Sequence, residues 1–342
     1  MDVFETLGAD PPEHCIFWSD PASGLEAILV LDDTSAGPCA GGIRTWAYPD
    51  RRAAIMDAAR LARAMTLKCA ISGLEAGGGK AVIIDRGQMD RRRAFEAFGR
   101  RVESLGGLFR TAGDLGTTQA DLEAAAAHCR FVHLAEHSLA QAVARGMLRC
   151  IEACAHFKGL SGVAGLRVAV QGCGAIGAAT ARTLARHGVE LTLADVDGPK
   201  ALQLASELGA RVVAPEEIIG LEADVLAPCA LGGVLCPETV ETVRAWAVCG
   251  GANNILTGPD AAAALRARGI LHVPDFVSSA GAVIDGVGET VMGLEDRGHL
   301  IDRLGEVALE VLTEAQRLGV TPTEVAVEMA TRRRARACGE GA

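Results

Sequence analysis

The sequence has few aromatic side chains and no excess of positive charge. Aromatic residues make up 4% of the 342 residues, although hydrophobic residues make up 49%. A core with so few large rings must consist of small side chains and close contacts between helices and sheets. Acidic residues outnumber basic ones by 43 to 33, for a net charge of -10 at pH 7. Because nucleic-acid binding needs a basic face, nucleic acid is not expected as a partner.

Long apolar stretches and metal-binding cysteine pairs are also missing. No run of about 18 apolar residues is present, and the first five residues are acidic rather than basic, so we predict neither a membrane partner nor a signal peptide. There are 11 cysteines but no CxxC pair, and nothing completes a metal set around Cys150 and Cys154. We therefore expect no metal site, reduced thiols and a cytoplasmic location.

One basic cluster stands near the C-terminus. It consists of Arg332, Arg333, Arg334 and Arg336. We interpret it as a solvated helix end, where cations favour the negative pole of the helix.

The length and the residue pattern predict two α/β domains. A domain typically has ~150 residues, and 342 residues suffice for two. Strand-like runs at 25–31 and 81–85 alternate with helical patterns at 51–67, 91–104 and 118–128. A long helical stretch begins near residue 134. We expect a mixed α/β domain over residues 1–133 and a Rossmann-type domain over 134–309, with C-terminal helices from about 310 to 342 packing back on the first domain.

A glycine-rich turn marks the expected cofactor site. The apolar strand 166–171 runs into Gly172-Cys173-Gly174-Ala175-Ile176-Gly177, a helix follows, and the next strand ends in an acid, Asp195. Glycines there permit a tight turn, close approach of a pyrophosphate and close helix packing, while the helix N-terminus supplies N–H donors. A carboxylate at Asp195 would accept hydrogen bonds from the ribose hydroxyls and repel a 2′-phosphate, so we predict NAD rather than NADP.

Two lysines flank a second glycine run. Lys68 lies 12 residues before Lys80, which follows Gly77-Gly78-Gly79. A lysine in an apolar cleft has a lowered pKa and can act as a base. The spacing alone is equally compatible with two surface lysines.

Six blocks in the same order carry a family resemblance. They are residues 37–44 with 77–80, then Thr111-Ala112-Gly113-Asp114-Leu115-Gly116-Thr117-Thr118, residues 170–174, Ala227-Pro228-Cys229-Ala230-Leu231-Gly232, Gly251-Ala252-Asn253-Asn254, and residues 274–281. Over roughly residues 13 to 320, the chain resembles the glutamate/leucine/phenylalanine/valine dehydrogenases, nearest the leucine and phenylalanine branch. The resemblance implies an NAD-dependent amino-acid dehydrogenase, whose first domain binds substrate and forms a homo-oligomer.

The resemblance also implies roles for particular residues. Lys80 would activate the water that attacks the imine carbon, and Asp114 would move protons to and from the amino nitrogen. Lys68 would bind the substrate carboxylate. The predicted substrate-binding residues are Lys68, Gly41, Gly42, Ala40, Asn254, Val283 and Gly286. The predicted cofactor contacts are Gly172, Gly174, Ala175, Ile176, Gly177, Asp195, Ala230 and Asn254.

Departures from the family affect the expected substrate. Leu139 stands where relatives carry a threonine, with Ser138 and His137 beside it, and Ser279 replaces an asparagine. The leucine branch has Leu at the position of Ala40 and Val at that of Gly286, so the expected pocket is larger and fits a bulky, aromatic amino acid such as phenylalanine or tryptophan.

Other functions stay open from the sequence. If neighbouring side chains fill the pocket, the substrate is a branched-chain amino acid. The changes at Leu139 and Ser279 are compatible with an NAD-dependent imine-reducing or condensing enzyme that uses another amine. A non-catalytic NAD-binding regulator is disfavoured, because it would not need Lys68, Lys80 and Asp114 together.

Overall fold

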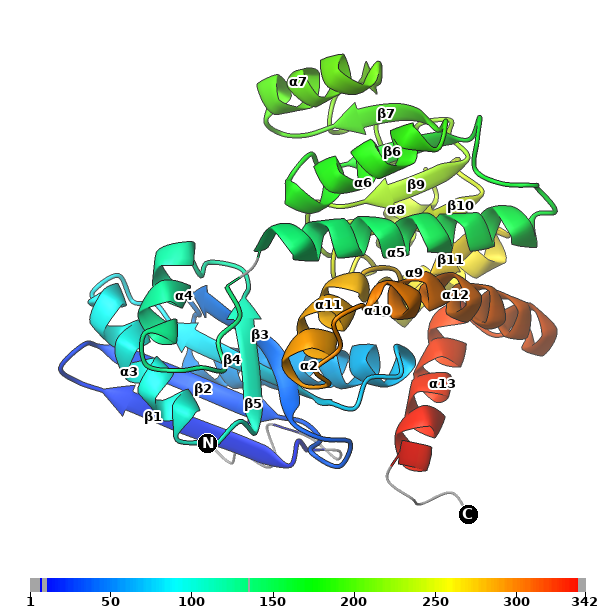
Figure 1. The fold of residues 1–342 in the computed structure, drawn as a ribbon. Coiled ribbons are helices and arrows are strands. Elements are labelled where there is room, and N and C mark those ends of the chain that lie inside the picture. Colours follow the sequence, from blue (N-terminus) through cyan, green and yellow to red (C-terminus); the bar gives the residue numbers. More distant parts are fainter. Residues whose placement is uncertain (1–6, 8–10, 135, 338–342) are drawn as a thin grey trace. The chain divides into compact units, whose positions relative to one another are not determined.

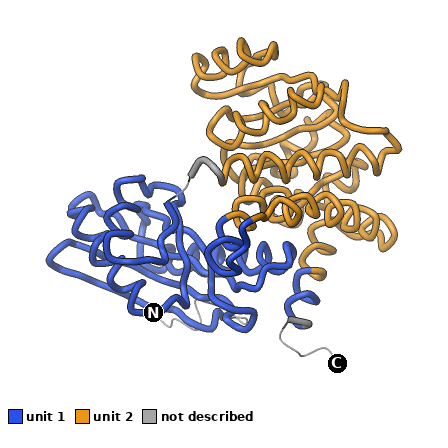
Figure 2. The backbone as a smooth tube through the Cα atoms, viewed as in Figure 1, with its two compact units in different colours: residues 1–136, 286–295, 330–342 blue, residues 137–285, 296–329 orange. Residues whose placement is uncertain are grey.

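The structure is a computed structural model that describes residues 7, 11–134 and 136–337. The chain forms two compact units (Figure 2). The first unit contains residues 1–136, 286–295 and 330–342, and the second contains residues 137–285 and 296–329. The predicted α/β class with two domains is confirmed.

The first unit is built on a five-stranded mixed sheet (Figure 1). Its strand order is β1-β2-β4-β3-β5, in which β3 lies parallel to β4 and β5, while β2 is antiparallel to β1 and β4. The elements are β1 (His14–Asp20), β2 (Leu25–Leu31), β3 (Cys39–Trp46), α2 (Arg51–Ile71), β4 (Gly77–Ile84), α3 (Arg91–Glu103), β5 (Phe109–Gly113) and α4 (Gln119–Ala126).

Both faces of this sheet are buried, which explains the continuous apolar runs. One face packs on α3 and α4 through a cluster that includes Leu29, Phe95 and Phe98. The other face packs on α2, where Val30 and Val82 meet small residues of the helix. Four buried phenylalanines thus lie on one side of the sheet, whereas the other side is packed largely by the small residues that the composition predicts.

The second unit is built on a six-stranded parallel sheet. Its elements are α5 (Glu136–Phe157), β6 (Arg167–Gln171), α6 (Ala175–Arg186), β7 (Glu190–Ala194), α7 (Gly198–Leu208), β8 (Arg211–Val212), β9 (Val225–Pro228), α8 (Pro237–Val240), β10 (Ala247–Cys249), α9 (Pro259–Ala267), β11 (Leu271–Val273), α10 (Asp275–Ser278), α11 (Gly281–Thr290), α12 (Gly298–Leu318) and α13 (Pro322–Ala337). Helices α11 and α13 each continue into the first unit.

The order of these strands indicates where a ligand is expected to bind. The sheet runs β11-β10-β9-β6-β7-β8, so the chain starts in the middle, winds to one edge and then returns to build the other half. This is the Rossmann order, and dinucleotides bind at the carboxyl ends of the strands where the winding reverses. Here the reversal lies between β6 and β9.

The C-terminal helices divide between the units differently from the expected boundaries. Helix α12 belongs to the second unit, where its Asp302 pairs with Arg145 and Arg149 of α5. Only the last part of α13 belongs to the first unit, where two of its arginines have partners.

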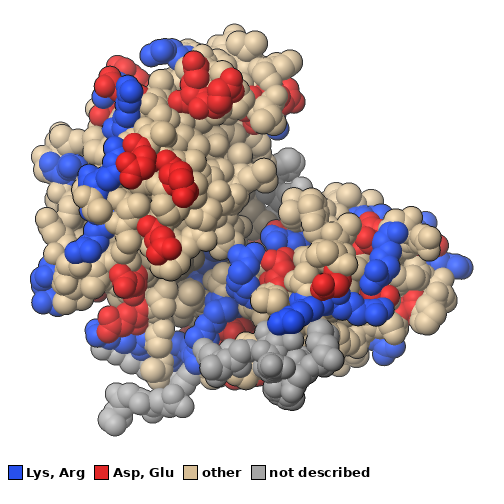
Figure 3. Space-filling model, turned by 180° about the vertical axis from the view of Figure 1, so that it is seen from behind, with Lys and Arg blue, Asp and Glu red and all other residues tan. Residues whose placement is uncertain are grey.

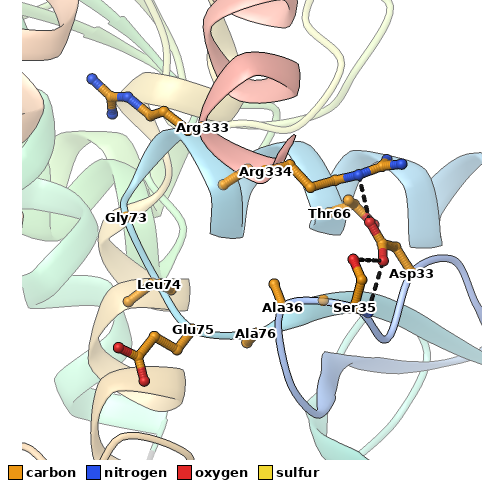
Figure 4. Close-up of a pocket in the computed structure, with 12 residues that line it drawn as sticks. Asp33, Ser35, Ala36, Thr66, Gly73, Leu74, Glu75, Ala76, Arg333 and Arg334 are labelled. Carbon is orange, nitrogen blue, oxygen red and sulfur yellow. Dashed lines mark hydrogen bonds and ion pairs between the residues drawn. The ribbon is translucent and has the colours of Figure 1, made fainter. Parts of the chain in front are cut away.

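Those arginines form one wall of a cavity in the first unit (Figure 4). Arg334 lies 2.6 Å from the carboxylate of Asp33, and Arg333 donates a hydrogen bond to the carbonyl of Ile71. The expectation of a solvated helix end was therefore wrong for Arg333 and Arg334. The cavity holds about 330 Å³ and is also lined by Thr66.

The surface carries charges of both signs. On the face drawn in Figure 3, blue and red side chains are interspersed. Several exposed arginines pair with acids, for example Arg182 with Glu207. No helix among the described residues combines the length and apolar character that crossing a membrane requires.

Candidate active site

Lys80 and Asp114 form a buried ion pair in the first unit. Lys80 lies in the middle of β4, and Asp114 directly follows β5, where its backbone N–H donates to the carbonyl of Ile43. The Nζ atom of Lys80 is 2.7 Å from Oδ2 of Asp114. The side chains are 7% and 21% exposed, so the pair is shielded from most solvent screening.

The two partners shift each other's titration. Burial lowers the pKa of Lys80 below the usual value for a lysine, although the charge of Asp114 and its hydrogen bond oppose this shift. Burial raises the pKa of Asp114, but the positive charges of Lys80 and Arg44 outweigh it and bring the pKa to about 2. At neutral pH, Asp114 is therefore a carboxylate, which can accept a hydrogen bond from an ammonium group.

Glycines on β3 bring backbone and reacting groups together. A Cβ at Gly42 would lie 2.9 Å from Cβ of Asp114 and 3.3 Å from Nζ of Lys80. A Cβ at Gly41 would lie 1.7 Å from the carbonyl oxygen of Gly79 on β4. Both positions therefore favour glycine, and a side chain at Gly42 would crowd Lys80 and Asp114.

Sequence reasoning missed two charged residues beside this pair. Nε of Arg44 on β3 is 2.9 Å from Oδ2 of Asp114, and Nη1 of Arg44 is 3.0 Å from Asp57 on α2. Arg44 lay within a block of the family resemblance, but the interpretation assigned it no role. The contact with Asp57 depends on how α2 packs on the sheet, which local sequence patterns do not reveal.

The other predicted substrate residues of the first unit lie nearby along the same elements. Ala40 is buried on β3, next to Gly41 and Gly42. Lys68 is buried in the last turn of α2. The structure thus brings Lys80, Asp114 and Gly42 together, whereas a role for Lys68 stays a prediction.

The predicted cofactor turn has the required shape. Gly172 follows β6 with a φ of 93°, which favours glycine, and its Cβ would lie 2.7 Å from Cβ of Ala230, beyond β9. A Cβ at Gly177 would lie 1.8 Å from the carbonyl oxygen of Gly172, so helix and turn pack closely. Gly174 caps α6 without a side-chain hydrogen bond and faces open space.

This geometry fits a dinucleotide. The first N–H groups of α6 can receive a pyrophosphate, because no side chain occupies the cap and none projects from Gly174. Ala175 and Ile176 form the first turn of the helix.

Asp195 closes the turn at the end of β7. Its carboxylate accepts hydrogen bonds from the backbone N–H of Cys173 at 2.6 Å and of Asp197 at 2.8 Å. Burial raises the pKa of Asp195, but these hydrogen bonds outweigh it, and the pKa lies below its usual value. A fixed, ionised acceptor therefore stands beside the glycine turn.

The remaining predicted residues lie along the second half of the chain. Asn254 has a φ of 53°, and its N–H donates to Asp275 at 2.8 Å. Val283 and Gly286 lie on α11, in the second and first unit respectively. The hydroxyl of Ser279 donates to the carbonyl of Asp275 at 2.6 Å. Leu139 lies half-buried on α5, while the side chains of His137 and Ser138 fall outside the described residues.

Within the described ranges, no group of three or more His, Cys, Asp or Glu side chains could hold a metal ion.

A Rossmann unit with an open glycine turn, in one chain with a buried lysine–carboxylate pair, is the combination expected of a dinucleotide-dependent oxidoreductase. Comparisons with known proteins agree. The family model "Glu/Leu/Phe/Val dehydrogenase, dimerisation domain" matches residues 12–131, and "Glutamate/Leucine/Phenylalanine/Valine dehydrogenase" matches residues 198–337. The chain belongs to the Glu/Leu/Phe/Val dehydrogenase family, so the resemblance inferred from the sequence is confirmed.

Individual relatives lie in the leucine/phenylalanine branch and beyond it. Leucine dehydrogenase of Geobacillus stearothermophilus is 37% identical, over 83% of this chain and 80% of the relative. The crystal structure of L-tryptophan dehydrogenase from Nostoc punctiforme has a TM-score of 0.85 and 34% identity, over 97% of this chain and 98% of that one. The hetero-hexameric glutamate dehydrogenase of Thermus thermophilus (Leu bound form) has a TM-score of 0.77 and 27% identity, over 97% and 91%. The chain is accordingly an amino-acid dehydrogenase.

Proposed function

We propose that this enzyme oxidises an L-amino acid with a bulky, aromatic side chain, such as phenylalanine or tryptophan, to the 2-oxo acid and ammonia. It would use NAD and water, and it would also catalyse the reverse reductive amination. The observation that carries the reaction is the buried ion pair of 2.7 Å between Lys80 and Asp114, beside Gly42, where a side chain would crowd the pair. An α-amino acid needs an acceptor for its ammonium group and a base for water, and this pair supplies both.

The pair also suggests how Lys80 becomes a base. When the substrate ammonium binds Asp114, it competes with Lys80 for the same carboxylate. Lys80 then loses the negative charge that raises its pKa, while its burial remains. The ammonium group of Lys80 then releases a proton more easily, and the neutral Lys80 amine can deprotonate the water that attacks the imine carbon.

Other residues complete the proposed binding of substrate and cofactor. Lys68 pairs with the substrate carboxylate, and Asn254, Val283 and Gly286 contact the substrate. The nicotinamide, when bound, accepts the hydride from the substrate Cα. The glycine turn from Gly172 to Gly177 holds the pyrophosphate, with Ala230 and Asn254 as further cofactor contacts.

A panel of substrates tests the proposed side-chain preference. With NAD in excess, we expect kcat/KM for L-phenylalanine and L-tryptophan to exceed that for L-leucine and L-valine by about tenfold or more, since one or two methylene groups are worth about 1–3 kcal/mol in an apolar pocket. The reason is the small size of Ala40 on β3 and of Gly286 on α11. The initial rate of NAD reduction is the measurement.

A variant sharpens the same test. Gly286→Val should lower kcat/KM for tryptophan more than for leucine, because it restores the bulk found in the leucine branch. Faster turnover of leucine and valine by the wild type would refute the aromatic preference. Reduction of the 2-oxo acid only with an amine other than ammonia would instead favour the imine-reducing enzyme.

The cofactor preference rests on Asp195. We propose NAD because the ionised carboxylate of Asp195 can accept hydrogen bonds from ribose hydroxyls and repels a 2′-phosphate. Asp195→Asn should lower kcat/KM for NAD by about 10-fold or more, since a hydrogen bond to a charged group contributes about 1.5–3 kcal/mol. The NAD-to-NADP ratio of kcat/KM should fall with it.

Glu190→Gln provides the matched control for this change. It removes the same charge from the opposite, exposed end of β7. Its NAD-to-NADP ratio should equal that of the wild type. A ratio that does not change in Asp195→Asn would show that another residue selects the cofactor.

We also propose a homo-oligomer in the cytoplasm. The first family model is described as a dimerisation domain, and a related structure is a hexamer. The ten cysteines that the structure describes are free thiols, as is usual in a reducing compartment. Light scattering coupled to size-exclusion chromatography measures the assembly, and a monomeric mass would contradict it.

A further inference from the structure

The guanidinium group of Arg44 joins two carboxylates. Its Nε atom lies 2.9 Å from Oδ2 of Asp114, and its Nη1 atom lies 3.0 Å from Oδ2 of Asp57. The three side chains are only 17–21% exposed. Because a guanidinium is planar and rigid, fixing one of its nitrogens fixes the direction of the others. Asp57 therefore determines how Arg44 meets Asp114.

Asp57 is itself anchored at both oxygens. The hydroxyl of Tyr48 donates to Oδ2 of Asp57 at 2.6 Å, and Arg60 lies 2.7 Å from Oδ1. Asp57 stands on α2, a helix of 21 residues that packs on the sheet. A side chain locked on a rigid element can hold a reacting group in place, which a loop residue does less well.

Arg44 can keep its ion pair with Asp114 throughout the reaction, whereas Lys80 cannot. Both cations contact the same oxygen of Asp114. In the proposed reaction Lys80 gives up its proton, and with it the ion pair. Arginine keeps its charge at every pH that a protein tolerates. We propose that Arg44, oriented by Asp57, is a positioning residue that holds the Asp114 carboxylate in place while Lys80 changes its protonation state. This inference rests on the proposed function of Lys80 and Asp114.

The charges around the pair predict shifts in the pKa of Lys80 in addition to a loss of rate. Burial and Asp114 act most strongly on the pKa of Lys80, but Arg44 also lowers it and Asp57 raises it. Tyr48 and Arg60 are further groups that contact Asp57. Removing the charge of Arg44 should therefore raise the pKa of Lys80, and removing the charge of Asp57 should lower it.

A double-mutant cycle tests the positioning role. Arg44→Met and Asp57→Asn should each lower kcat by about 10–100-fold with a smaller change in KM, since a small misplacement of a reacting group can cost about 10²-fold. If Asp57 acts through Arg44, the double variant should be no slower than Arg44→Met. Costs that simply multiply in the double variant would overturn the proposal, as would a wild-type kcat in either single variant.

Two further variants serve as a control and as a substitute in this experiment. Arg63→Gln removes a positive charge from the same helix, where Arg63 pairs with Asp32 at 3.4 Å, and should leave kcat unchanged. Arg44→Lys replaces Arg44→Met if the latter does not fold, because a lysine keeps the charge but its single ammonium cannot reproduce the two-nitrogen bridge. It should lower kcat without moving the pH profile. Thermal unfolding confirms that each variant is folded.

A second readout does not need turnover. The pH dependence of modification of Lys80 by an amine-directed reagent, located by mass spectrometry, reports the pKa of this lysine. The midpoint should move to higher pH in Arg44→Met, to lower pH in Asp57→Asn, and not at all in Arg63→Gln. Identical midpoints in all variants would overturn the coupling. If the wild type oxidises no amino acid, the proposed function fails, while these midpoints still decide whether Arg44 and Asp57 act on the pair.

Discussion

Replacing Lys80 with alanine should lower kcat/KM for amino-acid oxidation by about 10²–10⁴-fold, the usual contribution of a general base. That range corresponds to about 3 kcal/mol or more of transition-state stabilisation. The physical reason is the position of Lys80. Its amine is buried, 2.7 Å from the carboxylate of Asp114, and its pKa is lowered below the usual value for lysine. Alanine has no group that could take a proton from water.

The measurement is the initial rate of NAD reduction over a range of amino-acid concentrations, which gives kcat/KM. Lys158→Ala is the matched control, because it removes an exposed lysine that lies over the ring of Trp246 in the second unit. The control should keep the wild-type rate. NAD binding, followed by fluorescence, should persist in Lys80→Ala because the glycine turn lies on other elements. A loss of less than tenfold would remove Lys80 from the role of base.

Replacing Asp114 with asparagine should have an effect of similar size on kcat/KM, about 10²–10⁴-fold. Asparagine keeps the size of the side chain but can neither take a proton from the amino nitrogen nor balance the charge of Lys80. The acid limb of the pH profile should also move. Asp114 raises the pKa of Lys80, so its loss lowers that pKa, and the remaining activity should extend to lower pH.

The same variant should be less stable than the wild type at neutral pH. The pKa of Asp114 is about 2 in the folded protein and 3.8 ordinarily. A carboxyl whose pKa is depressed by folding stabilises the fold above its ordinary pKa, and this contribution is lost as the pH falls from about 4 to 2. The free energy of unfolding in denaturant should therefore differ between wild type and Asp114→Asn at pH 7, and the difference should shrink in acid.

Asp85→Asn separates catalysis from stability. Asp85 directly follows β4 and pairs with Arg91 at 3.0 Å, so its loss also breaks an ion pair of the first unit. It should reduce stability slightly and leave kcat unchanged. If Asp114→Asn changed stability but kept the wild-type rate, Asp114 would be a structural residue and not a proton acceptor.

The sequence predicts the elements of this protein better than the contacts between them. The strand at 25–31 matches β2 because a strand buried on both faces is apolar at nearly every position. The turn from Gly172 to Gly177 is recognisable because a strand, three spaced glycines and a helix follow one another locally. Strand β1 escaped prediction because, at the sheet edge, its half-buried and exposed side chains do not form a clear pattern.

The reaction centre was only partly predictable for the same reason. Lys80 and Asp114 were expected because their blocks resemble a family, but their contact joins two residues that are 34 positions apart in sequence. The link from Arg44 to Asp57 arises from the packing of α2 on the sheet. Such a contact depends on the rotation of the helix about its axis, and no local pattern specifies that rotation.

The contacts of Arg333 and Arg334 also bear on how the protein is made. Most of the first unit is synthesised early, since it includes residues 1–136, yet the arginines that reach Ile71 and Asp33 come near the end of the chain. On the ribosome, α13 can therefore dock beside the sheet that holds Lys80 only after the whole second unit has been synthesised. A nascent chain released before residue 330 would leave the buried carboxylate of Asp33 without its arginine. Completion of the first unit is thus coupled to synthesis of the chain through α13.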